Sequence, residues 1–171
     1  MTEGSLCVKT MRRVALALLI LLILAVDQRT KSLARQNLRG HSSRHFGLVT
    51  LIYAENTGAF LSIGSNLPPR LRTAIFDGIV TIALLVATVV LFRGRVQSRG
   101  DEVALALIVA GGVGNLIDRL RFAGRVTDFL YLSAGRLHTG VFNIADMAIT
   151  FGVLWLLTSW ALARASLHGD T

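Results

Sequence analysis

The strongest constraint in this sequence is a set of four apolar stretches, each long enough, or nearly long enough, to cross a membrane. They cover residues 14–33, 71–92, 103–122 and 141–163. A helix needs about 20 predominantly apolar residues to span the hydrocarbon core. The 171-residue chain is 53% hydrophobic with a mean hydropathy of +0.59, which is too apolar for an ordinary soluble domain of this length. We therefore predict a single membrane domain, residues 1–171, with four transmembrane helices.

Basic residues between the apolar stretches predict the orientation of the chain. The net charge is +8, but the cations lie in short loops, which is typical of topology signals and anionic-lipid contacts rather than of nucleic-acid binding. Loops rich in Lys and Arg remain in the cytoplasm, so both termini are expected there. The residues that support this orientation are Lys9, Arg12, Arg13, Arg93, Arg95 and Arg99. The first outer loop, about residues 34–70, departs from the rule with Arg35, Arg39 and Arg44.

That outer loop contains a segment with strand character. Residues 45–53 are rich in Val, Leu, Ile, Thr and Tyr, and Asn56-Thr57-Gly58 follows them. Such a run before turn-forming residues predicts a short strand or hairpin at the membrane surface. His41 and His45 have i, i+4 spacing, but no third ligand is evident, so no metal site is expected.

Six of the ten acidic residues fall on or near the outer side in this topology. A charge at the centre of a membrane helix costs about 2.5–3.5 kcal/mol on insertion scales, so such a cluster indicates function. Asp146 has no Lys or Arg within one helical turn to neutralise it. Asp27 with Lys31, and Asp118 with Arg119, could instead be ion pairs that fix helix ends. The six acidic residues are Asp27, Glu55, Asp77, Asp118, Asp128 and Asp146.

Helical spacing sharpens the prediction of a polar site. Asn143, Asp146 and Thr150 have i, i+3, i+7 spacing, which predicts one polar stripe on the fourth helix. Asn115 lies close to Asp118 at the outer end of the third helix, and Asp128 is placed in the short loop that follows. The glycine run at residues 111–114 lacks the Lys-Ser/Thr of a phosphate loop, so it indicates close helix packing.

Four local patterns occur in the order and spacing of a known family. They are Asp27-Gln28 with Lys31; Asn56-Thr57-Gly58-Ala59-Phe60; Gly114-Asn115-Leu116-Ile117-Asp118-Arg119 with Val126-Thr127-Asp128-Phe129; and Phe142-Asn143-Ile144-Ala145-Asp146. On these patterns the chain resembles lipoprotein signal peptidase, the signal peptidase II family, from about residue 12 to residue 163.

The resemblance implies an aspartic endopeptidase of the bacterial inner membrane. Such enzymes remove signal peptides from diacylglyceryl-modified prolipoproteins, before the lipidated cysteine and at the extracytoplasmic face. A small outer β-cradle, no cofactor and no metal are implied. Partners would be lipid-modified precursors and membrane lipids, with no nucleic acid, and a monomer is expected. The resemblance assigns catalysis to Asp128 and Asp146, substrate binding to Asn56, Asn115, Arg119 and Asn143, and support of the site to Asp27, Lys31, Gly58 and Asp118.

Two carboxylates that share one proton could hydrolyse a peptide bond without a metal or a covalent intermediate. The ionised partner would take a proton from water while the protonated partner hydrogen-bonds the scissile carbonyl. No Ser-x-x-Lys or Gly-x-Ser-x-Gly pattern suggests covalent catalysis. The alternative is a small four-span ion or proton-coupled transporter, in which the same aspartates would relay protons or bind cations.

Overall fold

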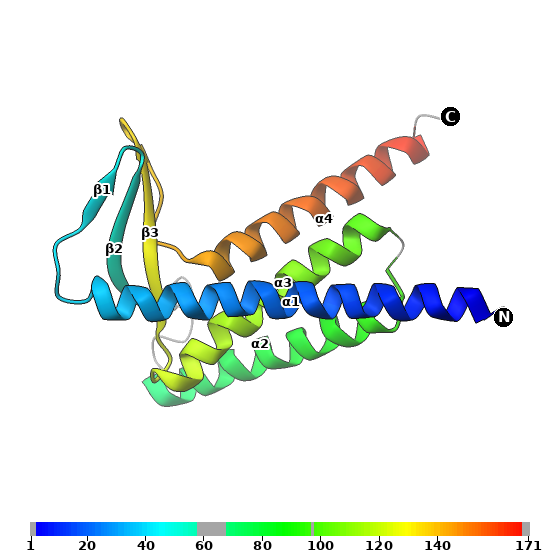
Figure 1. The fold of residues 1–171 in the computed structure, drawn as a ribbon, viewed down its shortest axis with the longest axis horizontal. Coiled ribbons are helices and arrows are strands. Elements are labelled where there is room, and N and C mark those ends of the chain that lie inside the picture. The colour runs from blue at the N-terminus through cyan, green and yellow to red at the C-terminus, as the bar shows by residue number, and fades with distance from the viewer. Residues whose placement is uncertain (1–2, 58–67, 97, 169–171) are drawn as a thin grey trace.

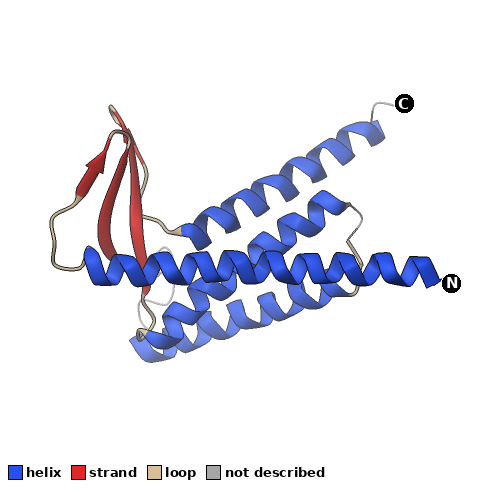
Figure 2. Ribbon diagram, viewed as in Figure 1, coloured by secondary structure: helices blue, strands red, loops and turns tan. Residues whose placement is uncertain are grey.

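The computed structural model describes residues 3–57, 68–96 and 98–168 as a helical bundle with a small sheet at one end (Figures 1 and 2). In these ranges the helices are α1 (Glu3–Asn37), α2 (Pro69–Phe92), α3 (Arg99–Arg121) and α4 (Ile144–His168). The strands are β1 (Arg44–Phe46), β2 (Val49–Asn56), β3 (Val126–Ala134) and β4 (Leu137–His138). The sheet stands at the end of the bundle where α1 and α3 finish and α4 begins (Figure 1).

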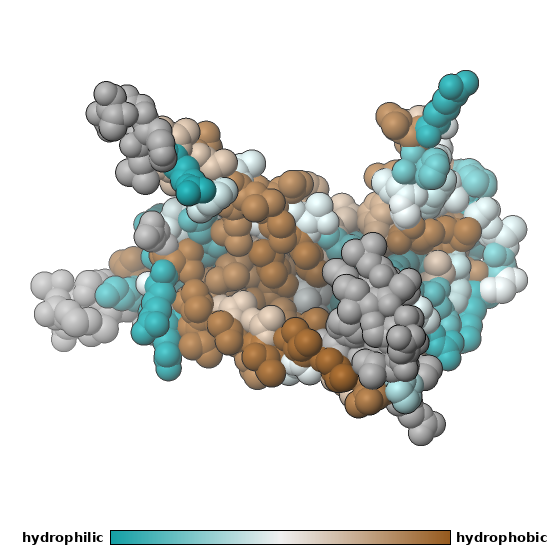
Figure 3. Space-filling model, turned by 180° about the vertical axis from the view of Figure 1, so that it is seen from behind, coloured by the Kyte–Doolittle hydropathy of each residue, from teal (hydrophilic) through white to brown (hydrophobic). Residues whose placement is uncertain are grey.

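Two of the helices are by themselves long and apolar enough to cross a membrane. They are α3 and residues Ile144–Ala165 of α4, while α2 contributes a shorter apolar stretch, Asp77–Phe92. In α1 the uncharged run is limited to residues 14–26, because Arg13 and Asp27 flank it. Hydrophobic side chains gather over the middle of the helices, with hydrophilic ones at both ends (Figure 3). The four predicted helices exist, and the apolar band indicates a membrane protein.

Helix α1 is longer than the predicted first span. Its 35 residues extend over roughly 52 Å at 1.5 Å per residue, against about 30 Å of hydrocarbon. The helix continues to Asn37, so the outer loop predicted to begin at residue 34 begins later. The additional turn places one further basic side chain of α1, that of Arg35, beside β3.

The sheet is antiparallel in the order β1-β2-β3-β4. The predicted strand at residues 45–53 is confirmed as the β1–β2 hairpin. The prediction of a loop around Asp128 is wrong, because these residues form β3. This strand pairs with β2 from Asn56↔Val126 to Val49↔Leu132. Partners about 75 residues away in the sequence supply the hydrogen bonds of this strand, and a local pattern does not reveal them.

Helices α3 and α4 approach each other through glycines. A Cβ at Gly111 would lie 2.4 Å from the carbonyl oxygen of Ala145, and a Cβ at Gly152 would lie 2.5 Å from that of Ala104. A methyl group therefore does not fit at either contact. This geometry agrees with the predicted role of residues 111–114 in close helix packing, in which small residues let two backbones meet.

Replacing Gly111 by Ala is expected to destabilise the protein by about 1–3 kcal/mol, the usual cost of overpacking a well-packed core. Thermal unfolding in detergent micelles measures the change. Gly78→Ala in α2 is the matched control, because apart from its chain neighbours and the backbone of its own helix, no atom of the described residues lies within 4 Å of its Cβ position. That variant should be as stable as the parent or gain roughly 0.5–1 kcal/mol. Equal melting of the two variants would contradict the proposed contact.

Candidate active site

Backbone hydrogen bonds join β3 to the start of α4. The N–H groups of Phe129 and Leu130 donate to the carbonyl oxygen of Phe142 at 3.0 and 2.9 Å, and the Phe142 N–H donates to the Leu130 oxygen at 2.8 Å. These bonds hold the residue before Asn143 against the strand that carries Asp128. Two predicted site residues from distant parts of the sequence thereby become neighbours.

Asn143 and Asp146 cap the first turn of α4 reciprocally. The Asp146 N–H donates to Oδ1 of Asn143 at 2.9 Å, and the Asn143 N–H donates to Oδ2 of Asp146 at 3.1 Å. This is the capping-box arrangement, with Asn and Asp in place of Ser/Thr and Glu. The predicted helical stripe is therefore wrong at Asn143, which precedes the helix, and the predicted fourth span starts three residues too early. Thr150 is exposed and donates to the carbonyl oxygen of Asp146.

Asp128 is buried, with 1% of its surface exposed. Its Oδ1 accepts a hydrogen bond from Nδ2 of Asn143 at 2.7 Å, and the side chain of Asn56 is also bonded to it. The pKa of Asp128 is raised from 3.8 to about 6. Burial and the charge of Asp146 raise it, while the hydrogen bonds of the two asparagines and the charge of Lys31 lower it. The two predicted catalytic carboxylates therefore interact electrostatically, and Asn143 contacts both.

Asn115 connects this pair to a buried cation. Its Nδ2 donates to Oδ1 of Asp146 at 2.8 Å, and its Oδ1 accepts from Nζ of Lys31 at 2.8 Å. Because an ammonium group only donates hydrogen bonds, it fixes which end of the amide faces Lys31. The amide NH₂ of Asn115 is thereby directed at Asp146.

Lys31 is completely buried between two buried carboxylates. Its Nζ lies 2.9 Å from Oδ2 of Asp27 and 3.9 Å from Oδ2 of Asp118. Oδ1 of Asp27 accepts the Ala145 N–H, and Oδ2 of Asp118 accepts the Thr127 N–H, both at 2.9 Å. Each of these aspartates therefore binds the residue immediately before one of the two predicted catalytic aspartates.

Arg35 belongs to this network, although no role in the site was predicted for it. Its Nη1 donates to Oγ1 of Thr127 at 2.8 Å and lies 3.4 Å from Oδ2 of Asp118. Asp27, Lys31 and Arg35 follow one another at i+4 spacing, and this signal could have been found had the first helix been extended past residue 33. Gln28 was part of a quoted pattern but received no predicted role, and its Nε2 donates to the carbonyl oxygen of Gly114 at 3.1 Å.

The described ion pair of Arg119 is with Asp77 on α2. The Nε of Arg119 is 3.8 Å from Oδ1 of Asp77. The suggested Asp118–Arg119 ion pair is wrong, because Asp118 pairs with Lys31 and Arg35 instead. Consecutive residues on a helix point in different directions, which explains the separation. Gly58, also predicted to support the site, lies outside the described residues.

The raised pKa of Asp128 predicts a pH-dependent stability. A carboxyl whose pKa is higher in the folded state favours folding when protonated, so its contribution is complete below about pH 4 and is lost as the pH rises through 6. We expect Asp128→Asn, which cannot ionise, to gain stability relative to the parent between pH 4 and pH 7.5, by on the order of 3 kcal/mol. Melting temperatures of both proteins across this range test the prediction. A difference that does not vary with pH would contradict it.

Comparisons with known proteins identify the family of this chain. Residues 19–162 match the family model described as signal peptidase (SPase) II. The lipoprotein signal peptidase of Syntrophus aciditrophicus is 38% identical over 138 residues, which cover 80% of this chain and 85% of the relative. That of Moorella thermoacetica is 41% identical over 142 residues, covering 81% and 87%. A solved bacterial membrane enzyme shares the fold, with a TM-score of 0.74 at 24% identity over 89% of this chain and 90% of that one. From the family match and these relatives, the chain belongs to the signal peptidase II family of membrane proteases.

Proposed function

We propose that Asp128 and Asp146 are the catalytic pair of a membrane aspartic endopeptidase that removes signal peptides from diacylglyceryl-modified prolipoproteins. Membership of the signal peptidase II family supports this reaction and decides against a transporter. The observation that carries the catalytic assignment is Asn143, which binds Asp128 through its side chain and Asp146 through its backbone N–H. One residue thus holds two carboxylates from different elements at the same place.

The surroundings of the two carboxylates suggest different roles for them. Asp146 receives N–H groups from Asn115 and Asn143 in the first turn of a helix, where negative charge is favoured. Asp128 is buried, which favours its neutral form. In our proposal Asp146 takes a proton from the attacking water while Asp128 hydrogen-bonds the scissile carbonyl. Asp128 then protonates the leaving nitrogen, and the pair titrates as a unit.

The remaining predicted residues have supporting roles in this proposal. Asn56, at the end of β2, and Asn143 would hold the substrate backbone by hydrogen bonds. The 3.8 Å contact of Arg119 with Asp77 is too long for a strong hydrogen bond, so donors of its guanidinium group stay available. In our proposal they bind a substrate carbonyl. Asn115 would orient Asp146 through the hydrogen bond from its Nδ2 and would also line the substrate site. The buried ion pairs around Lys31 would hold the backbone in front of each catalytic residue.

We further propose a single domain with four spanning helices in the inner membrane, both termini in the cytoplasm and the site at the extracytoplasmic face. The basic residues that support this orientation lie at the start of α1 and between α2 and α3, at the end of the bundle away from the sheet (Figure 1). The carboxylates lie at the sheet end. A monomer surrounded by membrane lipid is sufficient for the proposed site.

A paired cleavage assay tests the proposed substrate. The purified protein is given one prolipoprotein in two forms, with and without the diacylglyceryl group on its cysteine. We expect cleavage before the cysteine of the lipidated form only, because the acyl chains localise the precursor, each buried methylene contributing about 0.8 kcal/mol relative to water. Equal cleavage of both forms would refute specificity for lipoproteins, while the protease assignment would stand.

A further inference from the structure

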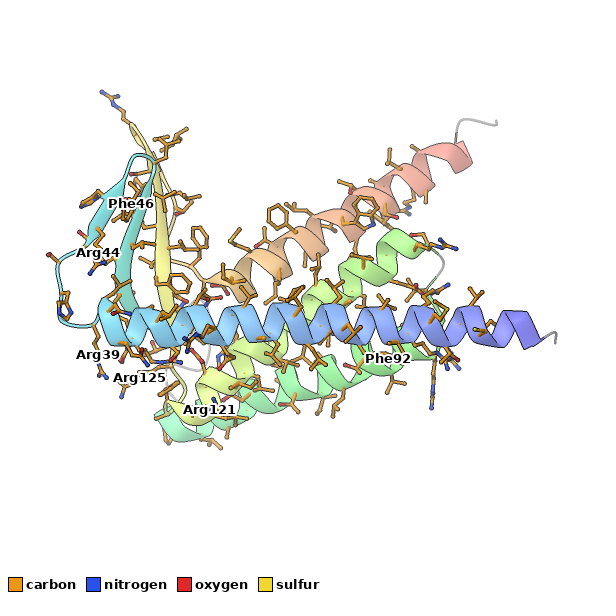
Figure 4. The ribbon with its side chains drawn as sticks, in the orientation of Figure 1. Arg39, Arg44, Phe46, Phe92, Arg121 and Arg125 are labelled. Atoms are coloured by element: carbon orange, nitrogen blue, oxygen red, sulfur yellow. The ribbon has the colours of Figure 1, made fainter. Side chains whose placement is uncertain are left out.

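A pocket of about 300 Å³ lies between the ends of α1 and α3 and the sheet, and four arginines line it. Arg35 and Arg39 come from the end of α1 and the turn after it, Arg121 is the last residue of α3, and Arg125 precedes β3. Figure 4 shows Arg39, Arg121 and Arg125 gathered at the sheet end of the bundle. The proposed reaction uses none of these four side chains directly.

The pocket carries an excess of positive charge. Glu55 is the one acidic residue among the described residues that line it, and it binds Arg125 at 2.5 Å and Arg39 at 3.5 Å. A hydrogen bond from Tyr53 and the contact with Arg125 lower the pKa of Glu55, so it is ionised at neutral pH. Asp118, behind the pocket, balances Arg35. Four cations against two carboxylates leave a net charge of +2.

Aromatic rings hold two of the guanidinium groups in place. Arg35 lies 4.4 Å from the centroid of the Phe122 ring, and Arg39 lies 5.8 Å from that of Tyr53. Arg121 is exposed, and no described residue accepts a hydrogen bond from it or forms an ion pair with it. A guanidinium group has five donors in a planar fork that matches the oxygens of a phosphate. Most of these donors remain available for a ligand.

The position of the pocket relative to the apolar surface indicates which anion it binds. Leu120 is 72% exposed and Leu33 is 42% exposed, and each precedes a pocket arginine by one or two residues. Helix α3, which ends at Arg121, is one of the two helices apolar enough to cross the membrane. The arginines therefore lie where the apolar surface stops, at the level of lipid headgroups. We propose that this arginine pocket binds the phosphate of an anionic phospholipid headgroup. The lipid belongs to the membrane leaflet at the sheet end of the bundle, where the carboxylate pair lies.

Native mass spectrometry of the full chain, released from bilayers of phosphatidylglycerol or phosphatidylcholine, tests this proposal. We expect retained phosphatidylglycerol and little phosphatidylcholine. Arg121→Gln should weaken phosphatidylglycerol binding about fivefold, since one basic residue near an anionic membrane surface contributes about 1 kcal/mol. Adding Arg125→Gln should weaken it further, while Arg121→Lys should retain most of the binding because it keeps the charge.

Arg44→Gln is the matched control, because Arg44 is an exposed arginine of β1 outside the pocket lining (Figure 4). This variant removes the same charge and should bind phosphatidylglycerol like the parent. Equal loss in Arg44→Gln, equal retention of the two lipids, or displacement of the lipid by an equal concentration of inorganic phosphate would overturn the proposal. The measurement needs no substrate, so its failure would leave the proposed peptidase activity untouched.

Discussion

Replacing either Asp128 or Asp146 by Asn is expected to abolish release of the signal peptide while the protein still inserts and accumulates. An amide can neither take a proton from water nor return one to the leaving nitrogen, and general acid–base catalysis is worth about 10²–10⁴-fold in rate. The size and shape of the side chain are retained, and the amide oxygen introduced by Asp128→Asn could still accept the hydrogen bond from Asn143. Turnover of a diacylglyceryl-modified precursor by each purified variant measures the effect.

Asp101→Asn is the control for this experiment. Asp101 lies at the opposite end of α3, where its Oδ1 accepts a hydrogen bond from the Trp155 indole at 3.1 Å. Its replacement should leave cleavage unchanged, since it is remote from the carboxylate pair. Full cleavage by either Asp128→Asn or Asp146→Asn would eliminate the two-aspartate mechanism.

Lys31→Met is expected to destabilise the protein by about 3–5 kcal/mol, the usual cost of removing one partner from a buried ion pair. Met approximates the volume of Lys, so the dominant effect is the loss of the cation between Asp27 and Asp118. Both carboxylates would remain buried, with Arg35 as the nearest positive charge to Asp118. Thermal unfolding in detergent measures the loss, and a reduced cleavage rate should accompany it because the Asn115 amide is no longer fixed.

Two further variants isolate the charge effect at Lys31. Lys9→Met changes an exposed lysine on the same helix and should have little effect. Combining Lys31→Met with Asp27→Asn should recover part of the lost stability, because the second change removes one uncompensated carboxylate. If Lys31→Met melts at the same temperature as Lys9→Met, the buried ion pairs do not hold α1 against α3.

The sequence predicted the parts of the fold that depend on local patterns. The apolar runs identified all four helices, and the β-branched run identified the β1–β2 hairpin. Strand β3 was missed because its polar Asp128 interrupts the apolar pattern and its hydrogen-bond partners lie in the distant β2. The Asp27–Lys31 pair was predicted correctly from i, i+4 spacing, while Asp118–Arg119 was not, since adjacent residues on a helix diverge.

The sequence singled out candidate residues of the site but did not predict the contacts between them. Family resemblance singled out Asn143 as a binding residue, whereas its contact with both aspartates depends on the start of α4. Helix boundaries are uncertain from sequence by a few residues, and here Phe142 bonded to β3 fixes the boundary. The arginine pocket depends in the same way on the extra turn of α1, which the apolar run alone does not predict.

The buried lysine has a consequence for how the chain is assembled in a membrane. Helix α1 is synthesised before α3, so Asp27 and Lys31 enter the bilayer without Asn115 or Asp118. One helical turn apart and 2.9 Å from each other, they neutralise one another within a single helix. Asp118 then meets a cation already in place, and last of all the start of α4 brings the Ala145 N–H to Asp27. The Asp27–Lys31 pair is thus neutralised within α1 before α3 and α4 are synthesised.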